Sequence, residues 1–294
     1  MKIVEERGRI LVQLFPNFVK LGRRGLAGWT VLIGSVIVTV IVLMTILSPW
    51  ISPHDPIAIN VGPILAPPNN VFPLGTNHLG QDMLSRVISG GAMVLQVATF
   101  SVIICILVGV PIGLLASFAG GATDKVTSLV MDSVYAFPGL VLAIAIAAML
   151  GRGVVNMSLA ISVIYIPSYF RIIRSQVLTI KELPYVEAAK ALGSRSRGIL
   201  LRYILPNVVP SIASVATINF ADAILTAAGL TFVGLGLSVA VPDWGWDLTY
   251  GRQLLPVGAW WVIAFPGLMI VLLAFGFTLM GEGLSELWSP RLEQ

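Results

Sequence analysis

Few side chains in this sequence could do chemistry, and they do not gather in one place. The chain has 14 Asp and Glu residues, two histidines and one cysteine among 294 residues. His54 and His78 could form a metal pair only across a long stretch of chain, which is weak support, so we expect loop residues and no metal site. Asp222 stands inside an apolar run and is a functional candidate by default. Its alternative role is to pack against Asn219 or against a side chain of a neighbouring subunit.

The elements that carry these residues must lie in a membrane. Hydrophobic residues make up 56% of the chain and charged residues 11%, with a mean hydropathy of +0.92. Soluble domains carry about 25% charged residues. So little charge could not cover the surface of a water-soluble fold, and the composition therefore predicts a polytopic membrane protein.

Six apolar segments are long enough to cross a bilayer or nearly so, since a helix needs about 20 residues to span the hydrocarbon core. They are residues 27–47, 92–119, 133–151, 154–170, 208–237 and 254–281. Backbone groups in lipid need partners within the segment, and no alternating barrel pattern appears. We therefore predict an all-α fold with six transmembrane helices. The first span is expected to remain uncleaved, because residues 47–49 do not resemble a signal-peptidase site.

The basic residues indicate the orientation. Of the 18 Lys and Arg residues, all but Arg86, Arg152 and Arg252 fall on one side if the N-terminus is cytoplasmic. Positive charge collects on the cytoplasmic side of membrane proteins. We therefore predict a multi-pass protein of the cytoplasmic (inner) membrane with both termini inside. The net charge of +4 and the pI near 9.4 are then topology signals in contact with lipid, and no nucleic acid is expected as a partner.

This orientation divides the chain into regions. They are a cytoplasmic segment 1–26, the first helix 27–47, an extracytoplasmic loop 48–91, a five-helix core 92–281 with an inner segment 171–207, and a cytoplasmic tail 282–294. Cys105 lies within the second span, and we expect a small apolar packing residue. In the outer segments we expect a local Asp82–Arg86 ion pair and tryptophans 244 and 246 at the headgroup level. Asp132 is expected to be a solvated charge at the boundary of the third span.

The inner segment predicts a helix–turn–helix bracket. Pro184 suits a first helical position, Glu187 suits a first turn, and Gly193 suits the position after a helix end. Val186, Ala189 and Leu192 share one face at helical spacing. A second short helix over residues 195–204 is expected to stop at Leu205 and Pro206. Such short helices bury too little area to be stable alone, so we expect them to dock in a groove of a partner.

One pattern in this bracket resembles a known family. Glu187, Ala188 and Ala189, followed by Gly193 and by Leu205–Pro206, resemble the EAA loop of ATP-binding-cassette importer permeases. Tyr203 stands where that pattern usually has isoleucine. The resemblance implies that these residues form a coupling helix between spans four and five, which docks on a separate ATPase subunit.

Further stretches resemble the C-type permease subunit of the oligopeptide and dipeptide importers. They are the Ser48–Pro56 segment, the Leu74–Arg86 run, Thr231–Gly236, Trp244–Gly245, Trp260–Trp261, Pro266–Gly267 and the closing Gly281–Arg291. They occur in the family order from about residue 23 to the end of the chain. The resemblance implies import of dipeptides or oligopeptides, with nickel complexes or oligosaccharides as the alternative cargo.

The resemblance also names the partners. This chain has no phosphate-binding G-x(4)-G-K-S/T pattern, so it carries no cofactor and is not an enzyme by itself. ATP and Mg would be bound by two ATP-binding subunits. A homologous second permease would complete the pathway as a heterodimer, a homodimer being the alternative, and an extracytoplasmic binding protein would deliver the substrate.

Three other functions are weighed against this one. An ion-coupled secondary transporter predicts charged, broken helices in two matching halves, and no internal repeat is visible. An intramembrane hydrolase needs His or paired acids within the spans, and both histidines lie outside them. A pure scaffold would have no use for the bracket.

Overall fold

The computed structural model describes residues 26–236 and 241–288. Over these ranges the chain is helical, and its one β feature is an isolated bridge between Thr76 and Asp82. The predicted all-α class is confirmed. The predicted N-terminal segment 1–26 lies outside the described residues apart from residue 26. Residues 289–294 of the predicted tail also lie outside them.

Five helices are long and apolar enough to cross a membrane, and a bent pair brings the number to six within the described ranges. The five are α3 (Leu26–Ile46), α6 (Gly91–Ala119), α9 (Val154–Ile180), α12 (Leu205–Phe232) and α14 (Trp261–Trp288). α5 (Met83–Ser89) leads into α6, and the short α4 (Ser48–Ile51) follows α3. The predicted spans therefore correspond to real helices, with one exception.

The exception is the third span, which is not one straight helix. The apolar run 133–151 is divided between α7 (Gly121–Tyr135) and α8 (Gly139–Leu150), which meet at 88°. Pro138 precedes α8 with φ −57° and ψ 115°, which is not a helical conformation. A proline has no N–H for the preceding turn and disfavours helical backbone in the residue before it. A hydropathy profile alone shows residues 133–151 as one apolar run and does not reveal this break.

Two helices extend beyond their predicted ends, and one further helix lies in an outer segment. α9 continues to Ile180, so the first part of the inner segment 171–207 prolongs the fourth span. α14 continues through Trp288, past the expected start of the tail at residue 282. The outer segment before α14 contains a further helix, α13 (Trp244–Leu254), and a 3₁₀ turn over Leu255–Val257.

Small residues allow the long helices to pack closely. α6 lies along α9, α3 along α14, and α12 along both α6 and α14. A Cβ atom at Gly109 of α6 would lie 2.9 Å from Tyr169, and one at Gly113 would lie 2.9 Å from Ile173. Pairs of glycines at this spacing let two helix backbones approach each other in membranes.

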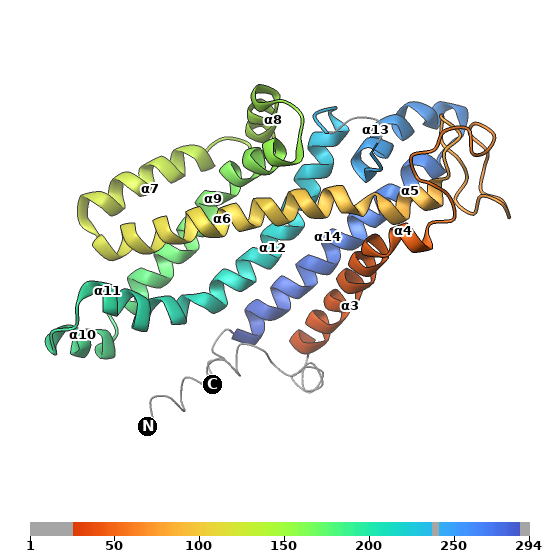
Figure 1. Cartoon of the computed structure of the whole chain (residues 1–294). Coiled ribbons are helices and arrows are strands. Elements are labelled where there is room, and N and C mark those ends of the chain that lie inside the picture. Colours follow the sequence, from red (N-terminus) through yellow and green to blue (C-terminus); the bar gives the residue numbers. More distant parts are fainter. Residues whose placement is uncertain (1–25, 237–240, 289–294) are drawn as a thin grey trace.

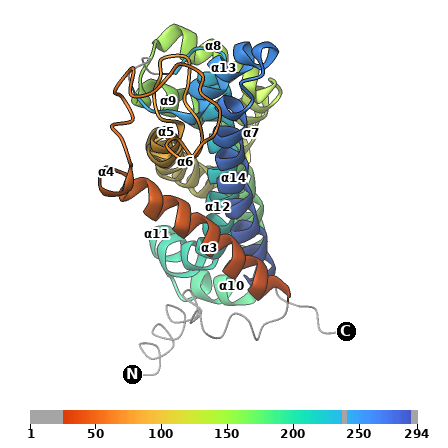
Figure 2. The same ribbon diagram turned by 90° about the vertical axis from the view of Figure 1, so that its right-hand side faces the viewer.

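The bundle is elongated, with a different structure at each end (Figure 1). One end carries α10 (Pro184–Ala191) and α11 (Ser196–Ile199), and the opposite end carries α5, α13 and the loop between α4 and α5. We call them the α10 end and the α13 end. In Figure 2, α3 crosses the front of the bundle beside α14. Cys105 is free and buried in the apolar cluster nearer the α10 end, as expected.

Candidate functional site

α10 forms where the sequence predicts it. Leu183 precedes it in extended backbone, and Pro184 takes a first-turn position, where its missing N–H breaks no helical hydrogen bond. Glu187 lies in the first turn and Lys190 in the last, so both charges favour the helix dipole. The predicted start of this helix is confirmed.

Gly193 ends the helix in a left-handed conformation, with φ +79°. Its N–H donates to Lys190 O at 2.9 Å, and the Ser194 N–H donates to Ala189 O at 3.0 Å. These two bonds form a Schellman motif, which satisfies carbonyls that the helix end leaves free. The predicted role of Gly193 as the residue after the cap is confirmed.

One face of α10 is buried and the other is open. Val186 and Ala189 are buried, and Val186 belongs to the apolar cluster that includes Ile199 and Ile204. Glu187, Ala188, Lys190 and Ala191 are exposed. Leu192 is 87% exposed, so the prediction that it shares one face with Val186 and Ala189 was wrong. The helix ends at Ala191, and the turn at Gly193 carries the chain away before Leu192 can reach the cluster.

The second helix of the bracket does not stop at Leu205 and Pro206, contrary to the prediction. α11 passes through a π-helical turn, η1 (Leu200–Ile204), directly into α12. The Leu205 N–H donates to Leu200 O, five residues back. A wider turn accommodates the proline, whose ring would clash with the carbonyl four residues back in an α-helix. The bracket is thus continuous with the fifth span.

The bracket, residues 184–207, is held together as one unit. The Asn207 amide donates to Tyr203 O at 2.6 Å and to the Tyr185 hydroxyl at 3.4 Å. The rings of Tyr185 and Tyr203 lie 6.3 Å apart. Three exposed arginines, Arg195, Arg197 and Arg202, line a hollow of about 450 Å³ beside it. The α10 end therefore presents small side chains next to positive charge.

Asp222 and Asn219 lie together in the bundle. Both line a hollow of about 350 Å³ beside the break between α7 and α8. The Asp222 carboxylate has no hydrogen bond or ion pair within the described residues, to Asn219 or to any other. Its backbone oxygen accepts a bond from Thr226 Oγ1 at 2.8 Å.

Two ion pairs that the sequence analysis missed connect α7 to α9. Asp124 accepts two bonds of 2.7 Å from Arg174, and Asp132 accepts one of 3.1 Å from Arg171. The Arg171 guanidinium also lies 4.2 Å from the centre of the Tyr135 ring. The side chains of Asp132 and Arg171 are largely exposed, so Asp132 is a boundary charge that has a partner.

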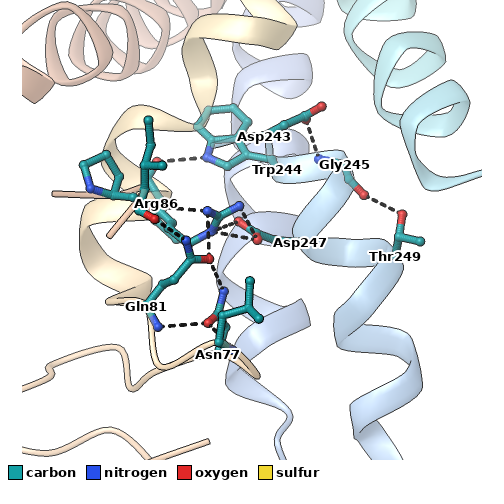
Figure 3. A network of polar contacts seen from close by, with 12 residues as sticks. Asn77, Gln81, Arg86, Asp243, Trp244, Gly245, Asp247 and Thr249 are labelled. Atoms are coloured by element: carbon teal, nitrogen blue, oxygen red, sulfur yellow. Dashed lines mark hydrogen bonds and ion pairs between the residues drawn. The ribbon is translucent and has the colours of Figure 1, made fainter. Parts of the chain in front are cut away.

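The α13 end contains a buried ion pair between distant parts of the chain. Arg86 of α5 donates to Asp247 of α13 from Nε at 2.9 Å, and its Nη2 lies 2.9 Å from the same carboxylate oxygen (Figure 3). Both side chains are almost fully buried. The remaining Arg86 donors reach Gln81 Oε1 and Pro56 O. We call the contacts of Arg86 and Asp247 the outer clasp.

The predicted Asp82–Arg86 ion pair is wrong, because each residue has another partner. Asp82 caps α5 and accepts from the N–H groups of Leu84 and Ser85 at 3.2 and 3.1 Å. His54 Nδ1 lies 3.2 Å from the same carboxylate. A cap residue turns its side chain back toward the helix start, so it does not reach along the helix to Arg86.

The tryptophans of this end are part of the packing. Trp244 is fully buried and donates from Nε1 to Val87 O at 2.9 Å (Figure 3). Trp246 is also buried, so the prediction of a headgroup position was wrong for both. Trp261 donates to Thr76 O at 2.9 Å. The Trp244 indole thus joins α13 to α5, and the Trp261 indole joins α14 to the loop before α5, because a buried N–H needs an acceptor.

Burial shifts the ionisation of the groups around the clasp. It raises the pKa of Asp247, and the Arg86 guanidinium opposes that shift. Burial also lowers the pKa of His78, and the positive charge of Arg86 adds to the effect. His78 is therefore neutral near pH 7 and stacks on Tyr250 at 4.6 Å. No group of three or more metal-ligating side chains occurs among the described residues.

Asp243 should make the α13 end less stable as the pH rises. It accepts the Gly245 N–H at 2.9 Å, but burial, followed by repulsion from Asp247, raises its pKa from 3.8 to about 6. The native state therefore holds its proton to a higher pH than the unfolded state. The stability from this group is complete below about pH 4 and falls as the pH approaches about 6.

Asp243→Asn should remove this loss, because an asparagine oxygen can accept the same bond without ionising. Relative to the wild type, the variant should gain up to about 2–3 kcal/mol between pH 4 and pH 6. Unfolding of the detergent-solubilised protein over this pH range measures the difference. A constant difference across the range would contradict the assignment.

The described residues offer no constellation for covalent catalysis, and their polar contacts either fix helices or line hollows. The comparisons with known proteins fit this picture. The family described as the binding-protein-dependent transport system inner membrane component matches residues 109–294, and the N-terminal transmembrane domain of oligopeptide transport permease C matches residues 29–68. The chain belongs to this transport family.

Full-length relatives support the membership. A di/tripeptide transport system permease protein of Pseudomonas aeruginosa is 36% identical over 88% of this chain and 88% of its own length. A probable D,D-dipeptide transport system permease protein of Escherichia coli is 37% identical over 87% and 86%. A glutathione transport system permease protein of Pectobacterium atrosepticum is 36% identical over 77% and 75%. The protein is thus a multi-pass permease component of the inner membrane and not a catalytic subunit.

Family membership also bears on the other functions considered. A binding-protein-dependent system argues against an ion-coupled secondary transporter and an intramembrane hydrolase. The match at residues 29–68 covers most of α3 and the beginning of the outer loop, and the match at residues 109–294 covers the bracket and α13. The two family matches therefore include segments at the α10 end and at the α13 end of the bundle.

Proposed function

We propose that this permease moves dipeptides or oligopeptides across the inner membrane, and that α10 is the coupling helix that receives the work of separate ATPase subunits. The observation that best supports the coupling role is the exposed face of α10. Its small residues Ala188 and Ala191 are exposed beside Glu187, while Val186 and Ala189 anchor the helix to the bundle.

A docked partner would move the bracket as one body. The Schellman turn at Gly193 fixes α10 relative to α11, and Asn207 joins the two arms. Leu205 and Pro206 lie where the bracket runs on into α12. Displacement of α10 would therefore be transmitted along the fifth span, because packed helices shift as rigid elements.

The cargo follows from the relatives. Those at 36–37% identity are named for di/tripeptide, D,D-dipeptide or glutathione transport. Nickel complexes and oligosaccharides have no comparable support among them. Peptides are thus the cargo that the relatives favour.

The family description and the exposed face of α10 support the choice of partners. A binding-protein-dependent system needs an extracytoplasmic binding protein and an energy source. We assign ATP and Mg to two ATP-binding subunits docked at the α10 end, and a homologous second permease to the other half of the pathway, as a heterodimer. With α10 facing the ATPases, the α10 end is cytoplasmic and both chain termini are inside.

Uptake into vesicles tests this function. The permease, its second permease and the ATPase subunits are reconstituted together with the binding protein. ATP-dependent accumulation of a labelled dipeptide is expected, and a slowly hydrolysed ATP analogue should not support it. Accumulation that requires an ion gradient instead of ATP would overturn the proposal.

A further inference from the structure

The hollow beside Asp222 lies where the third span breaks. The 88° bend between α7 and α8 leaves the end of one helix and the start of the other as two of its walls. α9 and α12 supply the others. Six of its lining residues matter here: Tyr135, Phe137, Tyr165, Ser168, Asn219 and Asp222. The volume of about 350 Å³ is of the size of sites for small organic groups.

Asp222 is the one charged residue among those that line the hollow. The described residues contain no ion pair or hydrogen bond for its carboxylate. The nearby Arg171 pairs with Asp132 and lies over Tyr135, and it does not line the hollow. When it is ionised, Asp222 places a negative charge in the hollow that no cation of the described residues compensates, and this favours a cationic ligand.

Asn219 is a second group without a partner. It lies one helical turn before Asp222 on α12, lines the same hollow and is only 7% exposed. Its Nδ2 atom makes no hydrogen bond of good geometry among the described residues, although the Tyr169 hydroxyl of α9 lies beside it. A buried donor without an acceptor costs about 1–3 kcal/mol, so such groups commonly await a ligand or a water molecule.

The aromatic side chains suit a cation as well. Thr226 donates its single hydroxyl hydrogen to Asp222 O, so the 2.9 Å contact with Tyr165 is a bond that the tyrosine hydroxyl donates. That bond fixes the Tyr165 side chain, which lines the hollow together with Phe137. An ammonium group over the face of such rings gains about 0.5–2 kcal/mol.

We propose that this hollow is a binding station for the amino-terminal end of a peptide in transit. Asp222 pairs with the α-ammonium group, and Asn219 donates to the first carbonyl oxygen, which lies close to that ammonium in every peptide. This pairing of an acid with an amide donor selects a free peptide amino terminus over a neutral sugar. The inference rests on the proposed function, since it names the part of the peptide that the pathway recognises.

Protection of a single cysteine tests the station without the selectivity of the binding protein. The purified permease complex carries Cys105→Ala and Ser168→Cys, so that the only thiol of this chain lies in the wall of the hollow. Alkylation is timed with N-ethylmaleimide in the presence of alanyl-alanine or N-acetyl-alanyl-alanine. Alanyl-alanine is expected to slow alkylation at least threefold, and the acetylated peptide should have no effect.

Variants identify the acid. Asp222→Asn should abolish protection, Asp222→Glu should restore part of it, and Glu282→Gln, an exposed acid of α14, should leave it unchanged. Equal protection by both peptides, none by either, or full protection in Asp222→Asn would overturn the station. ATP-dependent uptake of alanyl-alanine by the wild-type complex separates the two proposals. Uptake without charge-dependent protection overturns the station alone, and absence of uptake contradicts the peptide function.

Discussion

Replacing Gly193 by valine should strongly reduce energised peptide uptake while leaving the amount of permease in the membrane unchanged. Gly193 adopts φ +79°, and a β-branched residue strongly disfavours that conformation. Valine would unwind the Schellman turn that fixes α10 against α11, so a docked ATPase would push on a loose segment. A loss of at least about tenfold in the initial rate is expected, since coupling depends on a rigid bracket.

Two variants of the same region make the test specific. Gly193→Asn should retain much of the activity, because asparagine tolerates a left-handed backbone. Gly198→Val introduces the same side chain five residues later, where φ is not positive and no atom lies within 4 Å of the new Cβ. It should transport at close to the wild-type rate. Equal uptake by Gly193→Val and Gly198→Val, measured in vesicles with matched protein amounts, would remove the support for a rigid bracket.

Breaking the outer clasp should cost more stability than breaking any exposed pair of this chain. Asp247→Asn leaves the Arg86 guanidinium buried without its counter-charge. Removing one partner of a buried ion pair typically costs about 3–5 kcal/mol. The free energy of unfolding in mild detergent, followed by tryptophan fluorescence, measures the loss.

Asp132→Asn is the matched control. It removes the Arg171 pair, whose side chains are 53% and 66% exposed, and exposed pairs contribute about 0–1 kcal/mol. The double variant Arg86→Met, Asp247→Leu should recover part of the lost stability, because it removes both buried charges. If Asp247→Asn costs no more than Asp132→Asn, the clasp does not stabilise the α13 end.

The sequence predicted the spans because their signal is local. Uncharged runs of bilayer length must lie in the membrane, and their backbone groups find hydrogen-bond partners there only as helices in this chain. The bracket was predictable for a similar reason, since Pro184 and Gly193 constrain the backbone at their own positions. Their structure agrees with those constraints.

The wrong predictions rested on local spacing or residue type at positions where contacts with distant parts of the chain decide the structure. Arg86 was assigned to Asp82 by helical spacing, but it pairs with Asp247, 161 residues away. The tryptophans at 244 and 246 were assigned to the membrane interface by residue type, although both are buried and Trp244 bonds to Val87 of α5. Opposite charges in the two outer segments were the available signal for the clasp.

Two backbone features were also missed although proline marked both. Pro138 lies at the break in the third span, and Pro206 lies beside a π-helical turn that lets the helix continue. A proline shows that the regular hydrogen-bond pattern must change. It does not show whether the helix will bend, stop or widen by one residue, because neighbouring helices decide that.

Photo-cross-linking from α10 tests directly whether this helix docks on an ATPase subunit. A benzoylphenylalanine replaces Leu192, which is 87% exposed beside α10, and in a control it replaces Met149, which is 88% exposed on α8. Irradiation of the assembled transporter is followed by mass spectrometry of the adducts. An adduct between position 192 and an ATP-hydrolysing subunit is expected, and none from position 149. Failure of position 192 to reach that subunit, with uptake intact, would contradict the assignment of α10 as the coupling helix.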